Sequence, residues 1–174
     1  MIIETERLFI RPFNINDLND FYEYAAQPDV GPNAGWKPHE SLEEALEILE
    51  RFSANPQENA LVFKENNKVI GAAGVYNDDA NKSVMIGYVM NHDYWGRGLM
   101  TEAVKAVINE VFSAAETKNV VIKHFPFNSR SKRVIEKCGL KHIKNETGTF
   151  TRYDGTALDE CVWNISREEW IKSK

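Results

Sequence analysis

The chain has 174 residues, of which 43% are hydrophobic and 27% are charged, a balance typical of a soluble globular protein, and we expect one domain over residues 1–174. The formal net charge of −5 argues against direct nucleic-acid binding, because the phosphate backbone is bound mainly by lysine and arginine. No apolar run approaches the ~20 residues of a membrane span, and the N-terminus becomes charged at Glu4, so we expect neither membrane insertion nor secretion.

The two cysteines, Cys138 and Cys161, are too few for a disulfide scaffold. No Cys/His cluster has the spacing of metal ligands, so we expect no metal. We predict that both are buried free thiols and that the protein is cytoplasmic.

Strand and helix patterns alternate in the first third of the chain. A strand is predicted at 7–13, and a helix capped by Asn14 or Asn16 follows it. A loop rich in proline and glycine covers 28–38. Ser41 and Glu44 form a capping-box pattern that opens a second helix.

From about Ala60 the apolar period becomes that of strands. The runs at 61–63 and 69–76 predict a hairpin with a turn at Asn66-Asn67, and a third strand is predicted at 84–90. A longer helix begins near Met100, because apolar residues recur there at helical spacing.

The last third adds a strand, a helix and two strands. Residues 120–122 predict a strand buried on both faces, and 129–138 predict a helix that Gly139 ends. Strands at 141–152 and 158–165 are joined by a turn at 153–155. This order predicts a mixed α/β sheet with helices on both faces.

Two glycines, Gly96 and Gly98, lie between the end of a predicted strand and the start of a helix. The free amides and positive dipole of a helix N-terminus attract anions, and glycine lets a phosphate approach the backbone. The segment lacks the Gly-Lys-Ser/Thr of a P-loop and the third glycine of a dinucleotide fingerprint.

Two blocks of sequence resemble the GNAT superfamily of N-acetyltransferases. The first is similar to that family's acetyl-CoA pyrophosphate loop and reads Tyr94-Trp95-Gly96-Arg97-Gly98-Leu99-Met100-Thr101-Glu102-Ala103. The second is similar to its Asn-x-x-Ser helix and covers 127–140. The two chain ends resemble the branch that acetylates the N-termini of ribosomal proteins. The resemblance implies a GNAT fold, with a mixed, mostly antiparallel sheet of about seven strands splayed at the centre and about four helices on both faces.

The resemblance also implies roles for particular residues. The amides of 96–101 would hold the pyrophosphate of acetyl-CoA, the co-substrate, and Val89 and Met90 would contact the pantetheine arm and polarise the thioester. Asn128 would bond the same arm, and Gly87 would mark a bulge that opens the cleft. The expected cofactor-binding residues are Val89, Met90, Trp95, Gly96, Arg97, Gly98, Leu99, Met100, Thr101 and Asn128.

The chain departs from the family at three positions. Met100 replaces a small residue of the loop, which is acceptable if its side chain points into the core. Ile135 stands where the family often has a tyrosine acid, and Met85 where it often has a glutamate base. Ser131 is therefore our candidate catalytic residue, as the acid that protonates the leaving thiolate, and the alternative is that its hydroxyl only contacts CoA.

Four other side chains have two possible interpretations each. His92 and Asp93 follow the central strand and either titrate usefully or form a solvated turn. His124 either lines the cleft or is a surface histidine. Trp36 either recognises the acceptor or fills the core.

We therefore expect transfer of an acetyl group to a primary amine by direct attack in a ternary complex, because no nucleophile is placed for a covalent intermediate. The favoured acceptor is a protein or peptide N-terminus, since an α-amine with a pKa near ~8 needs a base less than a lysine-type amine near ~10.4 does. The alternatives are a small-molecule amine (polyamine, antibiotic or amino acid) and a non-catalytic acyl-CoA-binding module. We expect a monomer or a homodimer.

Overall fold

The computed structural model describes residues 1–78, 80–113 and 116–174. The strands are β1 (Ile3–Glu4), β2 (Leu8–Pro12), β3 (Glu58–Phe63), β4 (Lys68–Asp78), β5 (Ser83–Met90), β6 (Asn119–His124), β7 (Lys141–Thr151) and β8 (Ala157–Ser166). The helices are α1 (Leu18–Ala25), α2 (Leu42–Ala54), α3 (Leu99–Ser113), α4 (Ser129–Lys137) and α5 (Arg167–Lys172).

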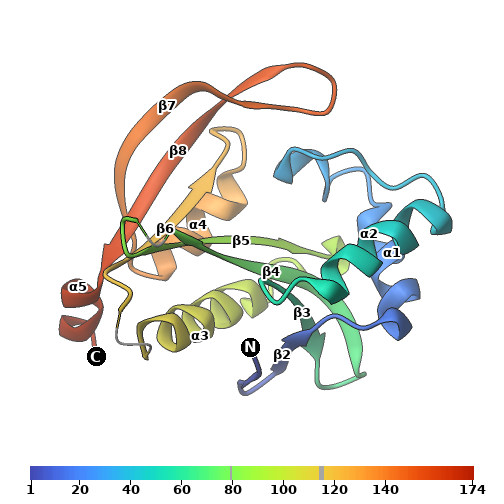
Figure 1. The fold of residues 1–174 in the computed structure, drawn as a ribbon, viewed down its shortest axis with the longest axis horizontal. Coiled ribbons are helices and arrows are strands. Elements are labelled where there is room, and N and C mark those ends of the chain that lie inside the picture. Colours follow the sequence, from blue (N-terminus) through green and yellow to red (C-terminus); the bar gives the residue numbers. More distant parts are fainter. Residues whose placement is uncertain (79, 114–115) are drawn as a thin grey trace.

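All eight strands form one sheet in the order β1-β2-β3-β4-β5-β6-β8-β7. Every neighbouring pair is antiparallel except β5 and β6, which run parallel. This pair is in register only from Ser83 to Met85, opposite Asn119 to Val121. Beyond Met85 the two strands separate, so the sheet is open on one side of 86–90 (Figure 1).

The predicted bulge at Gly87 is wrong. Strands β4 and β5 pair without a register shift from Gly71 opposite Met90 to Asp78 opposite Ser83. The opening therefore comes from the divergence of β5 and β6, and the nearby register shift lies in the pairing of β3 with β4, at Leu61/Val62 of β3.

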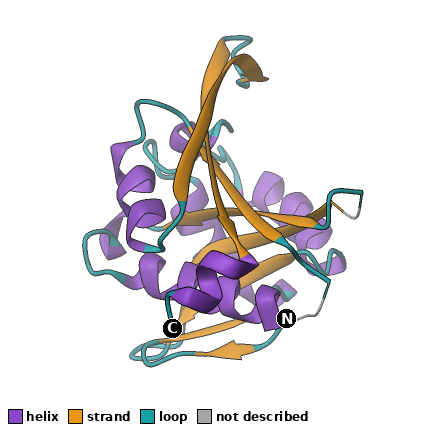
Figure 2. Ribbon diagram, turned by 90° about the vertical axis from the view of Figure 1, so that its left-hand side faces the viewer, coloured by secondary structure: helices purple, strands orange, loops and turns teal. Residues whose placement is uncertain are grey.

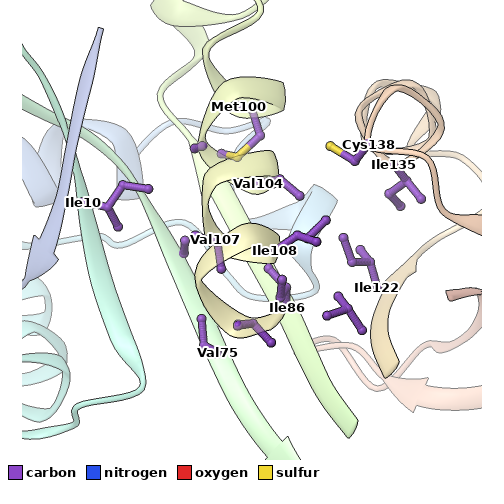
Figure 3. Packing of buried hydrophobic residues seen from close by; sticks show 14 of the residues in the cluster. Ile10, Val75, Ile86, Met100, Val104, Val107, Ile108, Ile122, Ile135 and Cys138 are labelled. Atoms are coloured by element: carbon purple, nitrogen blue, oxygen red, sulfur yellow. The ribbon is translucent and has the colours of Figure 1, made fainter. Parts of the chain in front are cut away.

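Two hydrophobic clusters give each face of the sheet its own helical layer. The larger lies between the sheet and α3 with α4, where Ile86, Val104, Ile122 and Ile135 meet (Figure 3). The smaller lies between the sheet and α1 with α2. The helices therefore cover both faces, as predicted, and each face has its own pocket beside β5.

The elements predicted from periodicity are present, with differences at their edges. Short helical turns that the pattern did not predict occur at Ile15–Asp17, Pro32–Ala34 and His92–Tyr94, and β1 and α5 were also not predicted. Ser41 caps α2 by accepting from the Glu44 amide, but Glu44 accepts from the Glu40 amide instead of completing the capping box.

Strand β6 is buried on one face only, against the prediction of two buried faces. Val120 and Ile122 face the core, while Val121 and Lys123 are half-buried. Lys123 Nζ lies 2.7 Å from Glu146 Oε2 and 3.3 Å from Glu160 Oε2, so charged groups rather than apolar ones occupy that face.

Strands β7 and β8 form a long hairpin that projects beyond the rest of the sheet (Figures 1 and 2). Most of β7 is exposed. Near its outer part the Phe150 ring packs edge-on against Phe125, with 5.0 Å between ring centroids, and occupies the space beside Gly35 where a Cβ would lie. The hairpin thus contacts the loop between α1 and α2.

Candidate active site

The glycine loop before α3 has the backbone shape of an anion site. Gly96 and Gly98 adopt φ values of +75° and +78°, a region that side chains with a Cβ rarely enter. A Cβ at Gly96 would meet nothing within 4 Å, and one at Gly98 would meet only Arg7 Nη2 at 3.7 Å. The loop therefore leaves free space in front of the first turn of α3, where amides lack helical partners.

A half-buried carboxylate on α3 connects this loop to the N-terminal segment of the chain. Glu102 on α3 accepts hydrogen bonds from Thr5 Oγ1 at 2.6 Å, from the Arg7 amide at 2.8 Å and from Arg7 Nε at 2.7 Å. Arg7 Nη1 in turn donates to the Arg97 carbonyl at 2.9 Å. Burial acts to raise the pKa of Glu102, but the bonds from Thr5 and Arg7 outweigh it and hold the pKa below its ordinary value.

Glu102→Gln is expected to destabilise the protein at neutral pH and to weaken acetyl-CoA binding through the loosened loop. A carboxylate with a lowered folded-state pKa stabilises the fold above its unfolded value near ~4.3, and this stabilisation disappears as the pH falls through the lowered pKa. Urea unfolding should therefore separate variant and wild type at pH 7 and bring them together in acid. A difference that stays constant down to pH 2 would contradict the role of the charge. Glu50→Gln, on the exposed face of α2, is the matched control.

A cavity of about 410 Å³ lies on the α3 and α4 side of the open edge of β5. Of the ten predicted cofactor-binding residues, nine line it: Val89, Met90, Trp95, Gly96, Gly98, Leu99, Met100, Thr101 and Asn128. The tenth, Arg97, does not; its guanidinium lies over the rings of Phe63 and Tyr94, so only its backbone belongs to the loop. Met100 is buried in the core, as its size requires.

Three cations from α4 also line this cavity: Arg130, Arg133 and Lys137. Together with the glycine loop they give it a positive wall that suits a ligand with several phosphates. The sequence pattern did not single them out, because a charged helix face is ordinarily solvated.

Trp95 connects the loop to the end of β5. Its Nε1 donates to the Met90 carbonyl at 2.8 Å, the His92 ring stacks on it with 4.4 Å between centroids, and the Arg130 guanidinium lies 4.6 Å from its centroid. His92 is exposed and its Nδ1 lies 2.6 Å from Asp29 Oδ2. The histidine thus belongs to the structure around Trp95 and lines neither cavity described here.

The first turn of α4 brings Ser131 to the same cavity, next to a tyrosine that the sequence analysis missed. Asn128 caps the helix: its Oδ1 accepts from the Ser131 amide at 3.0 Å, and its Nδ2 donates to the Asn33 carbonyl at 3.1 Å. The Tyr88 hydroxyl lies 2.9 Å from Ser131 Oγ. Burial raises the pKa of Tyr88 well above its ordinary value, although the bond to Ser131 acts in the opposite direction. The phenol is therefore protonated at neutral pH and able to donate.

A second cavity, of about 650 Å³, lies on the α1 and α2 face of the sheet. It shares Ala34, Tyr88 and Val89 with the first, so the two meet at the open edge of β5. Aromatic side chains dominate its walls: Phe21, Tyr24, Trp36, Phe52 and Tyr76. Trp36 both lines this cavity and packs on the smaller core, so it has the core contact that one interpretation predicted, while acceptor recognition stays a prediction.

The second cavity also holds a carboxylate, Glu58, that sequence reasoning missed. The predicted strand began near Ala60, whereas β3 begins at Glu58. Alternate residues of a strand share a face, so extending the predicted strand two residues toward the N-terminus would have placed Glu58 on the face of Ala60 and Val62, toward α1 and α2.

Two other expectations, for His124 and for Cys161, are wrong. His124 is buried beside Trp163 rather than on the surface, and it lines neither cavity. Cys138 is a buried free thiol, and burial raises its pKa to about 12, but Cys161 is only half-buried.

Within the described ranges, no group of three or more His, Cys, Asp or Glu side chains is arranged to hold a metal, and no helix is long and apolar enough to cross a membrane.

Comparison with known proteins identifies the family of the chain. The family model described as the acetyltransferase (GNAT) domain matches residues 7–141. The chain belongs to the GNAT acetyltransferase family. An uncharacterized N-acetyltransferase of Bacillus licheniformis, p20, is 24% identical over 176 residues, which cover 95% of this chain and 96% of the relative. We therefore describe the protein as a GNAT acetyltransferase.

Two solved acetyltransferase structures show the same fold at lower identity. The ribosomal-protein-S5-alanine acetyltransferase of Vibrio fischeri superposes with a TM-score of 0.78 and 19% identity, over 98% of each chain. The microcin C7 self-immunity acetyltransferase MccE, in complex with acetyl-CoA and AMP, gives a TM-score of 0.81 and 19% identity, over 93% of each chain.

Proposed function

We propose that the protein transfers the acetyl group of acetyl-CoA to a primary amine, with acetyl-CoA in the 410 Å³ cavity and the acceptor in the 650 Å³ cavity. The observation that carries this assignment is the contact of the two cavities at the open edge of β5, through Ala34, Tyr88 and Val89. Ligands that enter from opposite faces of the sheet can meet only there. Direct transfer between two bound substrates follows from this arrangement.

The residues of the first cavity fit acetyl-CoA. The open space at Gly96 and Gly98 admits a pyrophosphate to the backbone, and Arg130, Arg133 and Lys137 supply positive charge. When bound, acetyl-CoA supplies an acetyl thioester. Ser131 and Tyr88 hold hydroxyl protons beside the shared wall, where a leaving thiolate needs one.

Protein or peptide N-termini of the ribosomal-protein type are our first candidate acceptors. The similarity to the Vibrio fischeri enzyme runs over 98% of this chain and so includes both ends. Only the terminal residues of such an acceptor would need to enter the 650 Å³ cavity.

A small-molecule amine is the second candidate, and the size of the cavity favours it. About 650 Å³ lies within the ~300–1,000 Å³ of typical small-molecule pockets, and several aromatic side chains line it. The name of MccE, whose fold this chain shares, also points away from ribosomal proteins.

A panel of acceptors separates these proposals. Titration calorimetry first measures acetyl-CoA binding; turnover is then measured with alanine- and serine-initiated peptides, spermidine, an aminoglycoside and free amino acids. Efficient acetylation of the peptides alone supports the N-terminal assignment, and acetylation of a small amine alone replaces it. Acetyl-CoA binding without turnover of any amine would identify a non-catalytic acyl-CoA-binding module.

A further inference from the structure

Glu58 is a buried carboxylate on the wall of the second cavity, and its role there rests on the proposed function. Its side chain is only 8% exposed. The only side-chain partner described for it is the Tyr76 hydroxyl, which donates to Glu58 Oε1 at 2.7 Å. Arg51 and Lys37 also line the cavity, but among the described residues neither forms an ion pair with Glu58. A buried carboxylate without a cation is costly, unless a cationic ligand or a proton neutralises it.

Two glycines, Gly74 and Gly87, leave the space in which the Tyr76 side chain lies and reaches Glu58. Glu58 lies opposite Gly74 across β3 and β4, and Gly74 lies opposite Gly87 across β4 and β5. A Cβ on Gly74 would come within 2.2 Å of the Tyr76 hydroxyl oxygen, and one on Gly87 within 3.5 Å of its ring. The phenol thus lies flat over both glycines and points at Glu58. Burial, followed by the bond to Glu58, raises the pKa of Tyr76 well above its ordinary value, so it remains a donor.

Two further polar groups of this cavity lack partners. The Tyr24 hydroxyl and His39 Nδ1 are buried and form no hydrogen bond within the described structure. Both residues are more than nine-tenths buried and both line the cavity. Buried polar atoms are rarely left unsatisfied, so a cavity that combines two of them with an unpaired carboxylate is built for a polar, cationic ligand.

We propose that Glu58, oriented by Tyr76, binds the acceptor's ammonium group and accepts its proton before attack on the thioester. The family often carries a glutamate base on the central strand, where this chain has Met85, which points out of the sheet and is exposed. Here the carboxylate comes from β3 instead, two strands away. This position places the charge in the acceptor cavity and away from the cofactor.

The proton balance of the step is complete. One ammonium proton moves to a Glu58 oxygen, directly or through one water, and the neutral nitrogen forms the C–N bond with the thioester carbon. The C–S bond breaks and the sulfur leaves with its electron pair. As the amide forms, the Tyr88–Ser131 hydroxyl pair gives one proton to the thiolate and regains one from the second nitrogen proton, directly or through water, while Glu58 returns its proton to water, so one proton is released overall.

The other titratable groups that line this cavity are Tyr24 of α1, Lys37 and His39 of the α1–α2 loop, Glu44 and Arg51 of α2, Tyr76 of β4 and Tyr88 of β5. Burial lowers the pKa of His39, so it is neutral at pH 7 and gives Glu58 no counter-charge. Glu44 already bonds the Glu40 amide at the start of α2. Glu58 is thus the carboxylate available to an ammonium.

The test compares Glu58→Gln with wild type over pH 6 to 10, with an alanine-initiated peptide and spermidine as probes. We expect kcat at pH 7 to fall by ~10²-fold or more. Because the variant can use only amine that is already neutral, its deficit should shrink about tenfold per pH unit until the amine's own pKa is reached. Calorimetry with free CoA present should also show weaker spermidine binding at pH 7, while acetyl-CoA affinity stays unchanged.

Further variants separate a base from a structural group. Tyr76→Phe, which keeps the carboxylate but removes its donor, should lower kcat less than Glu58→Gln and leave the pH profile closer to that of wild type. Gly74→Ala should act like Tyr76→Phe, because the new methyl displaces the phenol. Glu50→Gln on exposed α2 is the charge-matched control.

Each outcome decides the proposal. A Glu58→Gln deficit that is equal at every pH, or a wild-type rate and profile, overturns it while the acetyltransferase function stands. If the wild type itself acetylates neither probe nor any other amine of the panel, the proposed function fails first, and the role of Glu58 fails with it.

Discussion

Gly98→Trp is expected to abolish acetyl-CoA binding while the protein still folds. The new side chain would project into the space before α3, where a Cβ now meets only Arg7 Nη2 at 3.7 Å. Hydrogen bonds to charged groups contribute ~1.5–3 kcal/mol each, so losing two backbone contacts to a pyrophosphate corresponds to ~10²–10⁴-fold in affinity. Titration calorimetry with acetyl-CoA measures this loss directly.

Gly155→Trp is the matched control for this variant. Gly155, in the turn between β7 and β8, has a φ of +82° and nothing within 4 Å of its missing Cβ. Both variants therefore suffer the same backbone strain, ~1–2 kcal/mol for a left-handed residue, but only Gly98 lies at the cofactor cavity. Near-native affinity in a folded Gly98→Trp protein would contradict the anion-loop assignment.

The second large effect is expected when both hydroxyls beside the shared wall are removed. Ser131→Ala should lower kcat by ~10²-fold if Ser131 is the acid that protonates the leaving thiolate. Tyr88 lies 2.9 Å from Ser131 Oγ and can donate in its place, so the single variants should lose less than the Ser131→Ala/Tyr88→Phe double variant. Steady-state kinetics at saturating acetyl-CoA, with calorimetry for its affinity, separates kcat from binding.

Comparison of the single variants with the double variant identifies which hydroxyl protonates the leaving thiolate. If Ser131→Ala weakens acetyl-CoA binding without lowering kcat, Ser131 only contacts CoA, and Tyr88 remains the candidate acid. If the double variant keeps the wild-type kcat, neither hydroxyl supplies the proton. Ser53→Ala and Tyr153→Phe, at exposed positions outside both cavities, control for the loss of a hydroxyl as such.

The cavity proposed for acetyl-CoA was predictable, because the loop that lines it lies in contiguous sequence. Gly96 and Gly98 need positive φ, and the helix that follows them has a clear apolar period, so the loop is visible as a local pattern. Ile135 also behaves as the sequence indicates: it is fully buried between α4 and β6, where no acid can act (Figure 3).

The acceptor side was not predictable in the same way. Glu58, Tyr76 and Tyr24 come from β3, β4 and α1, and only the register of the sheet brings them together. Our preference for an α-amine acceptor assumed that no base was placed, and Glu58 removes that assumption. Likewise, the separation of β5 from β6 depends on where a parallel pairing stops, which no local pattern specifies.

The loop between α1 and α2 contributes residues to the walls of both cavities. Val30 and Asn33 line the cofactor cavity, Trp36 and His39 line the acceptor cavity, and Ala34 lines both. Any ligand that orders this segment changes the free energy with which the other ligand binds, and thermodynamic linkage makes the change equal in both directions. Free CoA in one cavity is therefore expected to change the affinity for an amine in the other through residues 30–39, by the same factor in both directions.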